Sequence, residues 1–329
     1  MNKAALLTST SPFLPGTDIQ FAWDSTSLSY FKRCPRLYYY KMIEGWEERD
    51  ESIHLRFGIE YHSALQTYEE AKAQGADHDE AVREATFQLI KDIDDWNPDR
   101  DTKAGKNKNP ETLLRTTIWY LDEHKNDEAK TLIWKDGTPA VEQSFRWELD
   151  WGPSLERTER GRILPSQPYV LCGHLDKIVT YMDQRFVMDH KTTTWYLGPM
   201  YFNSYEPENQ MTLYSLASKV VLHSDHPVRG IIIDAARIEP ERSSFARGIT
   251  YRTPDQLTEW VHDLKHWLSL AEKYATEGYW PHNDTACDKY GGCKFREICS
   301  KSPKVRDRFL EGNFIRQAEE DKWNPLRKR

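Results

Sequence analysis

The stretch that decides the fold contains Gly173-His174-Leu175-Asp176 and, thirteen residues after that aspartate, Asp189-His190-Lys191. Residues 169–182 and 184–192, which contain the two motifs, are rich in the β-branched and aromatic residues that favour strands. Between them, Asp183-Gln184 is typical of a turn. The sequence therefore predicts a short β-hairpin that carries one motif on each strand.

Three charged side chains of this hairpin are predicted to meet on one face of a sheet. Side chains two residues apart on a strand share a face, so Asp189 and Lys191 point the same way, and Asp176 joins them from the neighbouring strand. Two carboxylates bind Mg²⁺ or Mn²⁺ through oxygen atoms, and a lysine beside them offsets charge that develops on a phosphate. The pattern predicts a metal-dependent phosphodiesterase, with a solvated face of an edge strand as the alternative.

The composition is that of a globular chain, because 38% of the 329 residues are hydrophobic and 29% are charged. This length allows one large or two modest domains. No apolar run approaches the length of a membrane span, and the apolar stretch at residues 4–7 is too short for the core of a signal peptide. We therefore expect a cytoplasmic protein that has no membrane partner.

The net charge of −7 argues against a protein that coats nucleic acid without specificity. It does not exclude a nuclease, because bound metal ions add positive charge to an acidic site. Two basic runs, at residues 103–108 and at residues 301–308 with Lys328 and Arg329, are predicted to be solvated loops or tails. The sequence contains no phosphate-binding loop that ends in Gly-Lys-Ser/Thr, so we expect no ATP-driven motor in this chain.

The chain has five cysteines, and three of them lie within thirteen residues of sequence. An odd number in a chain predicted to be cytoplasmic argues against a disulfide framework. A structural zinc site and an iron–sulfur cube both need four ligands, so Cys287, Cys293 and Cys299 need a fourth. Cys34, which lies among aromatic residues near the N-terminus, is the better candidate, whereas Cys172 on the predicted strand is expected to be a small core residue. The alternative is that the three clustered cysteines bind no metal.

The remaining pattern predicts helices, then strands, then further helices, without an internal repeat. Helices are predicted at residues 28–34, 35–40, 57–72, 79–94, 111–124, 207–222, 254–277 and 305–319, and further strands at residues 140–151, 228–238 and 245–252. Pro207 is predicted to open its helix at the first position. The apolar run at residues 228–238 predicts a central buried strand, and the polar residues 97–109 predict a mobile loop.

Four polar residues outside the hairpin are candidates for the same site. His62, on the predicted helix 57–72, is either a structural residue or a metal ligand. Gln210 and Tyr214 are four residues apart and share a helix face, so they either contact nucleic-acid backbone and orient the lysine, or form an ordinary surface pair. Glu142 either faces the site from its strand or lies at a sheet edge.

Taken in order, six segments resemble those of one family. They are Ser27-Leu28-Ser29-Tyr30-Phe31-Lys32-Arg33-Cys34-Pro35-Arg36-Leu37-Tyr38-Tyr39, Gly58-Ile59-Glu60-Tyr61-His62, the two hairpin motifs, residues 210–214, and the three clustered cysteines. Together they resemble the RecB-type nucleases of the PD-(D/E)XK superfamily. The resemblance is to the iron–sulfur branch, which includes the AddB nuclease domain and the CRISPR-associated RecB-like exonucleases, and it spans residues 27–299.

The resemblance implies a role for each matching residue. His62, Asp176 and Asp189 would ligate Mg²⁺ or Mn²⁺, assisted by the backbone carbonyl of His190, and Lys191 would be the catalytic lysine. Gln210 and Tyr214 would form the motif downstream of that lysine, completing the set of catalytic residues.

The resemblance also implies that Cys34, Cys287, Cys293 and Cys299 hold a [4Fe–4S] cluster that ties the two ends of the chain together. Five residues, including Gly291-Gly292, lie between Cys287 and Cys293, where several family members have two. This departure leaves zinc open as the bound metal.

The implied fold is α/β, with a restriction-endonuclease-like core, a mixed central sheet flanked by helices, an N-terminal helical insertion, and closure of the termini by the metal cluster. The implied division is an arm at residues 1–23, a helical region at 24–135, the nuclease core at 136–280, and the cysteine loop with a final helix at 281–329.

The implied function is that of an exonuclease acting on single-stranded or duplex DNA ends in recombination, repair or replication, as stand-alone phage and bacterial enzymes do. A recombinase, an annealing protein or a helicase is the implied protein partner. The alternatives are a non-catalytic iron–sulfur module that binds DNA or another protein on the same fold, and a zinc-stapled scaffold.

Overall fold

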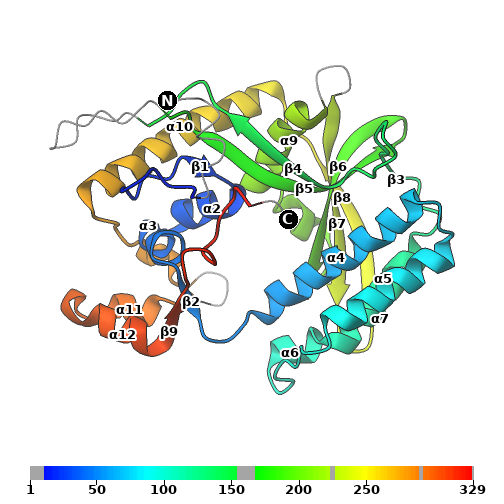
Figure 1. Cartoon of the computed structure of the whole chain (residues 1–329), viewed down its shortest axis with the longest axis horizontal. Coiled ribbons are helices and arrows are strands. Elements are labelled where there is room, and N and C mark those ends of the chain that lie inside the picture. Colours follow the sequence, from blue (N-terminus) through cyan, green and yellow to red (C-terminus); the bar gives the residue numbers. More distant parts are fainter. Residues whose placement is uncertain (1–10, 154–166, 223–226, 289–291, 328–329) are drawn as a thin grey trace. The chain divides into compact units, whose positions relative to one another are not determined.

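The computed structural model describes residues 11–153, 167–222, 227–288 and 292–327 (Figure 1). Residues 1–10 of the predicted arm, Gly291 of the cysteine loop, and the basic residues Lys328 and Arg329 lie outside these ranges. The chain forms two compact units: unit 1 comprises Met1–Asp50, Ser144–Gly173 and Pro254–Arg329, and unit 2 comprises Glu51–Gln143 and His174–Thr253. The four-part division predicted from the sequence stays a prediction.

Unit 2 is built on a mixed sheet. Its strands are β3 (Lys130–Thr131), β4 (Val141–Glu148), β5 (Val170–Tyr181), β6 (Gln184–Thr193), β7 (Val228–Ile238) and β8 (Ser243–Thr250), and β4 and β5 continue into unit 1. The order is β5-β6-β7-β8, with β3 and β4 also paired to β5. The β6–β7 pair is parallel, whereas β5–β6 and β7–β8 are antiparallel. The expected mixed sheet with β7 as an inner strand is confirmed.

The predicted hairpin forms, with its turn one residue earlier than expected. Tyr181 pairs with Gln184, so Met182 and Asp183 are the two turn residues, with φ of 49° and 57°. Two consecutive left-handed residues match the right-handed twist of the strands on either side. Met182 is 72% exposed but has the side chain of a strand residue, and for that reason the sequence placed the turn too late.

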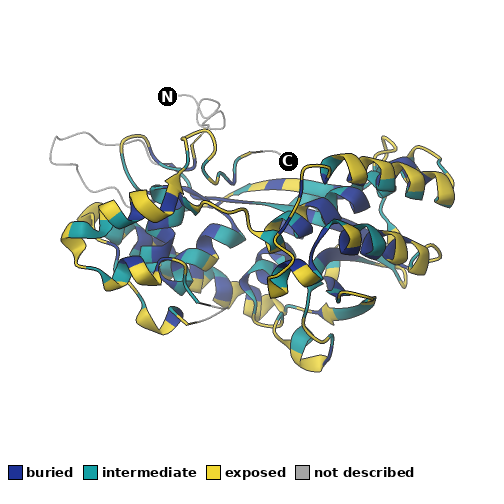
Figure 2. Ribbon diagram, turned by 90° about the horizontal axis from the view of Figure 1, so that it is seen from below, coloured by how far each residue is buried: buried dark blue, intermediate teal, exposed yellow. Residues whose placement is uncertain are grey.

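Helices cover both faces of this sheet. They are α4 (Ile53–Ala73), α5 (His78–Asp92), α6 (Lys103–Asn107), α7 (Pro110–Glu123), α8 (Pro199–Asn203) and α9 (Asn209–Leu222). Tyr120 of α7 bonds to Asp234 of β7, whereas Gln210 of α9 bonds to Lys191 of β6. In the register of β6 and β7, Asp234 lies opposite His190, so their side chains share a face of the sheet. Lys191 is the next residue on β6 and points to the other face, so the two helix contacts are on opposite faces of the sheet. The helices keep exposed outer sides (Figure 2).

The helices α4, α5 and α7 pack together through an apolar cluster of unit 2. Phe57, Tyr61 and Leu65, one turn apart along α4, are buried against Leu89 of α5 and Leu113 of α7. The cluster also contains Ala236 and Ile238 of β7. This packing fixes α4 against the sheet, and α4 carries His62.

Part of the predicted loop 97–109 is helical, which corrects the sequence analysis. Thr102 caps α6 by accepting a hydrogen bond from the Gly105 N–H at 3.0 Å. Lys108, expected in a solvated basic run, is only 3% exposed. Its Nζ donates to the Thr192 hydroxyl at 2.9 Å and lies 5.0 Å from the centre of the Phe57 ring, and burial lowers its pKa to about 8. The local composition could not predict this burial, because it depends on contacts with residues distant in sequence.

The helix predicted from Pro207 begins at Asn209, and α8 precedes it unpredicted. The intervening turn is held by Arg252, whose guanidinium donates to the Tyr205 carbonyl at 2.9 Å and to the Glu208 carbonyl at 3.4 Å. Because the donor comes from more than forty residues later, the sequence gives no local signal for this turn.

Unit 1 combines the two ends of the described chain. Its elements are β1 (Ala22–Trp23), α2 (Ser25–Arg33), α3 (Pro35–Tyr38), the π-helix η1 (Tyr39–Ile43), β2 (Trp46–Glu48), α10 (Pro254–Glu277), the 3₁₀ turns η2 (Asp284–Ala286) and η4 (Pro303–Val305), α11 (Arg296–Ser300), α12 (Arg306–Asn313) and β9 (Phe314–Arg316). β1 is parallel to the start of β5. An aromatic cluster contains Trp23 stacked on Tyr38 at 5.5 Å between ring centres.

The final helix is shorter than predicted. Instead of continuing to residue 319, α12 ends at Asn313, and β9 follows it as the antiparallel partner of β2. Pairing with residues 46–48 takes over the backbone hydrogen bonds that further helix would use, and no local pattern reveals a partner so distant in sequence. None of the helices in the described ranges is long and apolar enough to cross a membrane.

Candidate active site

The carboxylate of Asp176 is held between strand and helix in unit 2. Its Oδ2 accepts a hydrogen bond from the His190 N–H at 2.9 Å and lies 3.4 Å from Nδ1 of His62. The other ring nitrogen of His62, Nε2, lies 3.0 Å from the backbone carbonyl oxygen of His190. The structure thus brings together His62, Asp176 and the His190 carbonyl, three groups that the sequence analysis selected.

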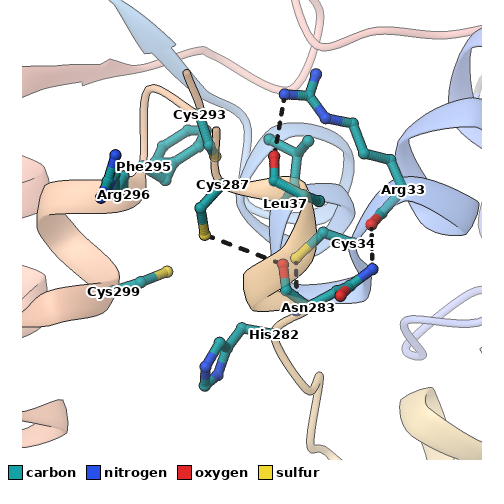
Figure 3. A pocket seen from close by; sticks show the side chains of 11 residues that line it. Arg33, Cys34, Leu37, His282, Asn283, Cys287, Cys293, Phe295, Arg296 and Cys299 are labelled. Carbon is teal, nitrogen blue, oxygen red and sulfur yellow. Dashed lines mark hydrogen bonds between the residues drawn. The ribbon is translucent and has the colours of Figure 1, made fainter. Parts of the chain in front are cut away.

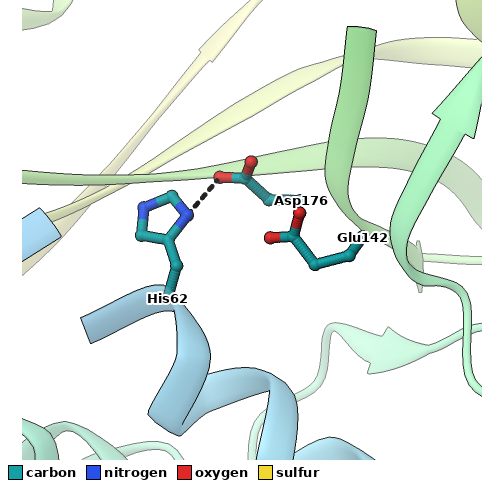
Figure 4. Close-up of side chains that lie close together, drawn as sticks. All are labelled: His62, Glu142 and Asp176. Carbon is teal, nitrogen blue, oxygen red and sulfur yellow. Dashed lines mark ion pairs between the residues drawn. The ribbon is translucent and has the colours of Figure 1, made fainter. Parts of the chain in front are cut away.

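Glu142 joins this group from β4. One ligand atom each of His62, Glu142 and Asp176 lies within 4.8 Å of the other two (Figure 4). Glu142 has φ of 45°, and a left-handed backbone is costly for a residue with a side chain. The sequence left two positions open for Glu142, because regular strand alternation does not reveal such a local distortion.

A second chain of contacts starts at Asp189, which is 1% exposed. Asp189 Oδ2 lies 2.7 Å from Lys191 Nζ. Lys191 Nζ donates to Gln210 Oε1 at 2.9 Å, and Gln210 Nε2 donates to Tyr214 Oη at 2.8 Å. Gln210 and Tyr214 therefore lie on the side of α9 that faces the lysine. The Lys191 side chain is 25% exposed.

The two aspartates have pKa values shifted in opposite directions. Burial raises the pKa of Asp189 to about 6, and the charge of Asp176 adds to this, while Lys191 opposes it. Burial also disfavours the charged form of Asp176, but His62 and Lys191 bring its pKa below the ordinary value. Although burial opposes its charge, both aspartates raise the pKa of Lys191, so the lysine stays protonated.

The donor set fits a divalent cation. Carboxylate and carbonyl oxygens suit Mg²⁺ and Mn²⁺, whereas an imidazole nitrogen is a ligand more typical of transition metals. Oδ1 of Asp189 is buried and accepts no hydrogen bond from the residues that the structure describes, and leaving such an oxygen without a partner is unfavourable. A cation beside Asp176 and Asp189 would satisfy this oxygen and offset their mutual repulsion.

A layer of charged residues supports the site from the other sheet face. The His190 Nδ1 lies 3.7 Å from Asp234 Oδ2, which accepts hydrogen bonds from the Tyr120 hydroxyl at 2.6 Å and from the Arg247 Nη2 at 2.9 Å. Arg247 also donates to both carboxylate oxygens of Asp127. Burial lowers the pKa of His190 to about 4, so its ring is neutral. The sequence analysis missed this layer, although a charged Asp234 within an apolar run was a signal.

The sequence profile of the PD-(D/E)XK nuclease superfamily matches residues 23–300, which is most of the chain. The chain belongs to this superfamily. No curated protein matches it. Among solved structures, a "putative exonuclease" from Eubacterium rectale is 12% identical, with 82% of this chain and 86% of that chain covered and a TM-score of 0.47. SSO0001 is 13% identical, with 75% and 76% covered and a TM-score of 0.29.

Membership of the PD-(D/E)XK superfamily indicates that the protein is a nuclease, a phosphodiester hydrolase, and nucleases of this superfamily use divalent metal ions. The cluster of His62, Glu142 and Asp176 is a carboxylate and histidine group of the kind that holds such an ion. The predicted hairpin and its helices are thus placed in a nuclease fold.

Unit 1 of this PD-(D/E)XK chain contains a second candidate site, a pocket lined by Cys34, Cys287, Cys293 and Cys299. Figure 3 shows sulfur atoms of Cys34, Cys287 and Cys299 directed toward the space between them. Cys34 Sγ accepts the Asn283 N–H at 3.3 Å, which joins the N-terminal segment to the cysteine loop. All four are free cysteines, and four thiolates are the number of protein ligands that a structural zinc ion or an iron–sulfur cube requires.

Cys172 lies apart from this pocket, as expected. It is fully buried in an apolar cluster of unit 1 with Phe21 and Val170. Burial raises the pKa of its thiol to about 12, so it behaves as a small apolar side chain.

Proposed function

We propose that this nuclease is a Mg²⁺- or Mn²⁺-dependent exonuclease that hydrolyses DNA from single-stranded or duplex ends. The observation that carries the proposal is that Asp176 accepts a hydrogen bond from the backbone N–H of His190, the residue after Asp189, while Asp189 has one oxygen at Lys191 and the other without a donor among the described groups. His62, Asp176, Asp189 and the His190 carbonyl would hold the metal, and Glu142 is close enough to join them. A bound divalent ion supplies charge stabilisation at the phosphate and an activated water.

Lys191 is proposed to act directly on the scissile phosphate. Its ammonium group is protonated, and a positive charge at this position can offset the negative charge that builds up on the phosphate oxygens. Gln210 Oε1 accepts a hydrogen bond from this ammonium group, and Gln210 Nε2 donates one to Tyr214, which restricts where the ammonium group can lie. Gln210 and Tyr214 are therefore proposed as residues that position the lysine, because Tyr214 is only 5% exposed and offers little surface to the DNA backbone.

The cysteine pocket is proposed to hold a [4Fe–4S] cluster on Cys34, Cys287, Cys293 and Cys299, with zinc as the alternative occupant. Such a cluster would tie the N-terminal segment to the cysteine loop, because Cys34 precedes the other three by roughly 250 residues. This assignment would place the chain in the RecB-type branch. We further propose a cytoplasmic role in recombination, repair or replication, including in phage, with a recombinase, an annealing protein or a helicase as partner.

Cleavage of end-labelled linear DNA and of circular controls tests the proposal. Asp189→Asn and Lys191→Met should each lower the rate by at least ~10²-fold, because each removes a group that stabilises charge in the transition state. Asp183→Asn is the matched control, since this exposed carboxylate lies in the turn of the same hairpin. Chelation of divalent ions should abolish cleavage.

Near wild-type cleavage by either site variant would refute the site assignment. Absence of cleavage by the wild-type protein with either metal would favour a non-catalytic DNA-binding module. Equal cleavage of circular and linear substrates would contradict the exonuclease assignment.

A further inference from the structure

Three large apolar side chains are exposed immediately after β6. Trp195, Tyr196 and Met200 are 73%, 75% and 87% exposed. They begin the stretch at residues 195–205, here called the aromatic segment, which also contains Tyr201, Phe202 and Tyr205. A group of exposed apolar side chains indicates a binding surface, since removing their apolar area from water by contact with a ligand would be favourable.

The aromatic segment is held in place by the rest of unit 2. Phe202 packs against Gly248 of β8 so closely that a Cβ at this glycine would lie 2.3 Å from the ring. The Tyr205 carbonyl accepts a hydrogen bond from Arg252 at 2.9 Å, and the Tyr205 hydroxyl donates to that of Tyr201 at 3.0 Å. These contacts fix the backbone at the end of the aromatic segment, so ordering that backbone costs little further conformational entropy when a ligand binds.

The aromatic segment begins beside the proposed catalytic lysine. Trp195 follows Lys191 by four residues, so their Cα atoms are at most about 14 Å apart, the length of about four stacked nucleotides at ~3.4 Å each. Burial raises the pKa of Tyr201, and the charges of Lys191 and Asp189 also act on its hydroxyl. The base of the segment thus lies within electrostatic reach of the site.

A cation accompanies the exposed rings. The Arg237 guanidinium on β7 lies 5.8 Å from the centre of the Tyr196 ring and pairs with Glu239 at 3.1 Å. Aromatic rings next to an arginine are the side chains on which proteins stack unpaired bases, because each base offers a flat π surface. In a duplex the bases already stack on one another and are not free to stack on protein side chains.

We infer that Trp195 and Tyr196 form a stacking platform for the bases of an unpaired DNA strand whose backbone passes Lys191. The inference rests on the proposed nuclease function and deepens it, because it makes a single-stranded or frayed end the preferred substrate. Trp195 and Tyr196 are then specificity-determining residues, since they bind bases and leave the phosphate to the charged site.

Binding of a labelled single-stranded oligonucleotide and of a blunt duplex, measured by anisotropy with divalent ions chelated, tests the platform without cleavage. Trp195→Ala should weaken single-strand binding at least about 5-fold, and duplex binding by a smaller factor. Trp195→Phe should retain most of the affinity, because a ring remains. Trp119→Ala is the matched control, since Trp119 on α7 is 44% exposed and also lies beside an arginine, Arg115.

Oligonucleotides with one abasic position, moved along the strand, distinguish stacking from a general loss of affinity. For at least one position, removing the base should weaken binding to the wild type but have little further effect on Trp195→Ala. Unchanged single-strand binding in Trp195→Ala, or additive losses at every position, would overturn the inference and would point to a protein partner for this surface. Cleavage by the wild type is scored separately, so failure of the platform and failure of the nuclease assignment give different results.

Discussion

Replacing Arg247 by methionine removes a cation that pairs with Asp234 inside unit 2. The Asp234 side chain is 0% exposed, and burial alone would raise its pKa, but His190 and Arg247 bring that pKa below its ordinary value. Removing one partner of a buried pair leaves a charge without compensation and typically costs about 3–5 kcal/mol. For a unit of this size, that loss corresponds to a fall of about 6–20 °C in Tm.

The pH dependence of this loss follows from the same contact. Without Arg247 the folded-state pKa of Asp234 should rise, so the charged carboxylate destabilises the variant at neutral pH. As the pH falls toward the ordinary carboxyl range, about 4, Asp234 takes up a proton in the variant. The wild type keeps the benefit of its lowered Asp234 pKa over this range and loses it only as the pH falls below about 4. The difference in unfolding free energy between the two proteins should therefore shrink as the pH falls.

Thermal and urea unfolding followed by circular dichroism measures the effect. Arg242→Met is the control, because Arg242 is 71% exposed and its pair with Glu239 at 2.8 Å should contribute at most about 1 kcal/mol. Adding Asp234→Asn to Arg247→Met should recover part of the stability, since the unpaired charge is gone. If Arg247→Met loses no more stability than Arg242→Met, or loses as much at pH 4 as at pH 7, the reasoning is wrong.

If the pocket holds an iron–sulfur cluster, Cys34→Ser should remove the bound metal and the brown colour of the protein, whereas Cys172→Ser should keep both. Iron and zinc analysis of the purified proteins measures this. Full iron loading of Cys34→Ser would contradict the assignment. Gln210→Ala should lower the single-turnover cleavage rate by about 10–100-fold, because it removes a hydrogen bond to a charged lysine, and Tyr214→Phe by about 2–10-fold. Both variants should change the Kd for DNA less than the rate, and an effect on Kd alone would count against a positioning role.

Local patterns predicted the elements whose signals lie within a few residues. The apolar run Val228–Ile238 and the amphipathic helix Pro254–Glu277 have the predicted bounds, and the strand spacing of Asp189 and Lys191 placed both on one side of the sheet. Gln210 and Tyr214 were also selected correctly as a same-face pair, because helical periodicity is a local property.

The remaining features depend on contacts between distant residues. Glu142 reaches the metal group through a left-handed backbone, and Lys108 is buried by its bond to Thr192. The start of α9 depends on Arg252, and the end of α12 depends on pairing with β2. In each case the free energy that decides the local conformation comes from a partner that no sequence window contains.

The way unit 1 is assembled from separated segments sets the order in which the protein can mature on the ribosome. The residues of the candidate active site, from His62 to Tyr214, are all synthesised before Asn283, whose N–H binds the Cys34 sulfur. At ~5–20 residues per second, Cys34 waits about 10–50 s for that partner. During this interval its thiol is open to oxidation. If the pocket holds the proposed metal centre, the supply of reductant and metal during translation would therefore limit how much of the protein completes unit 1.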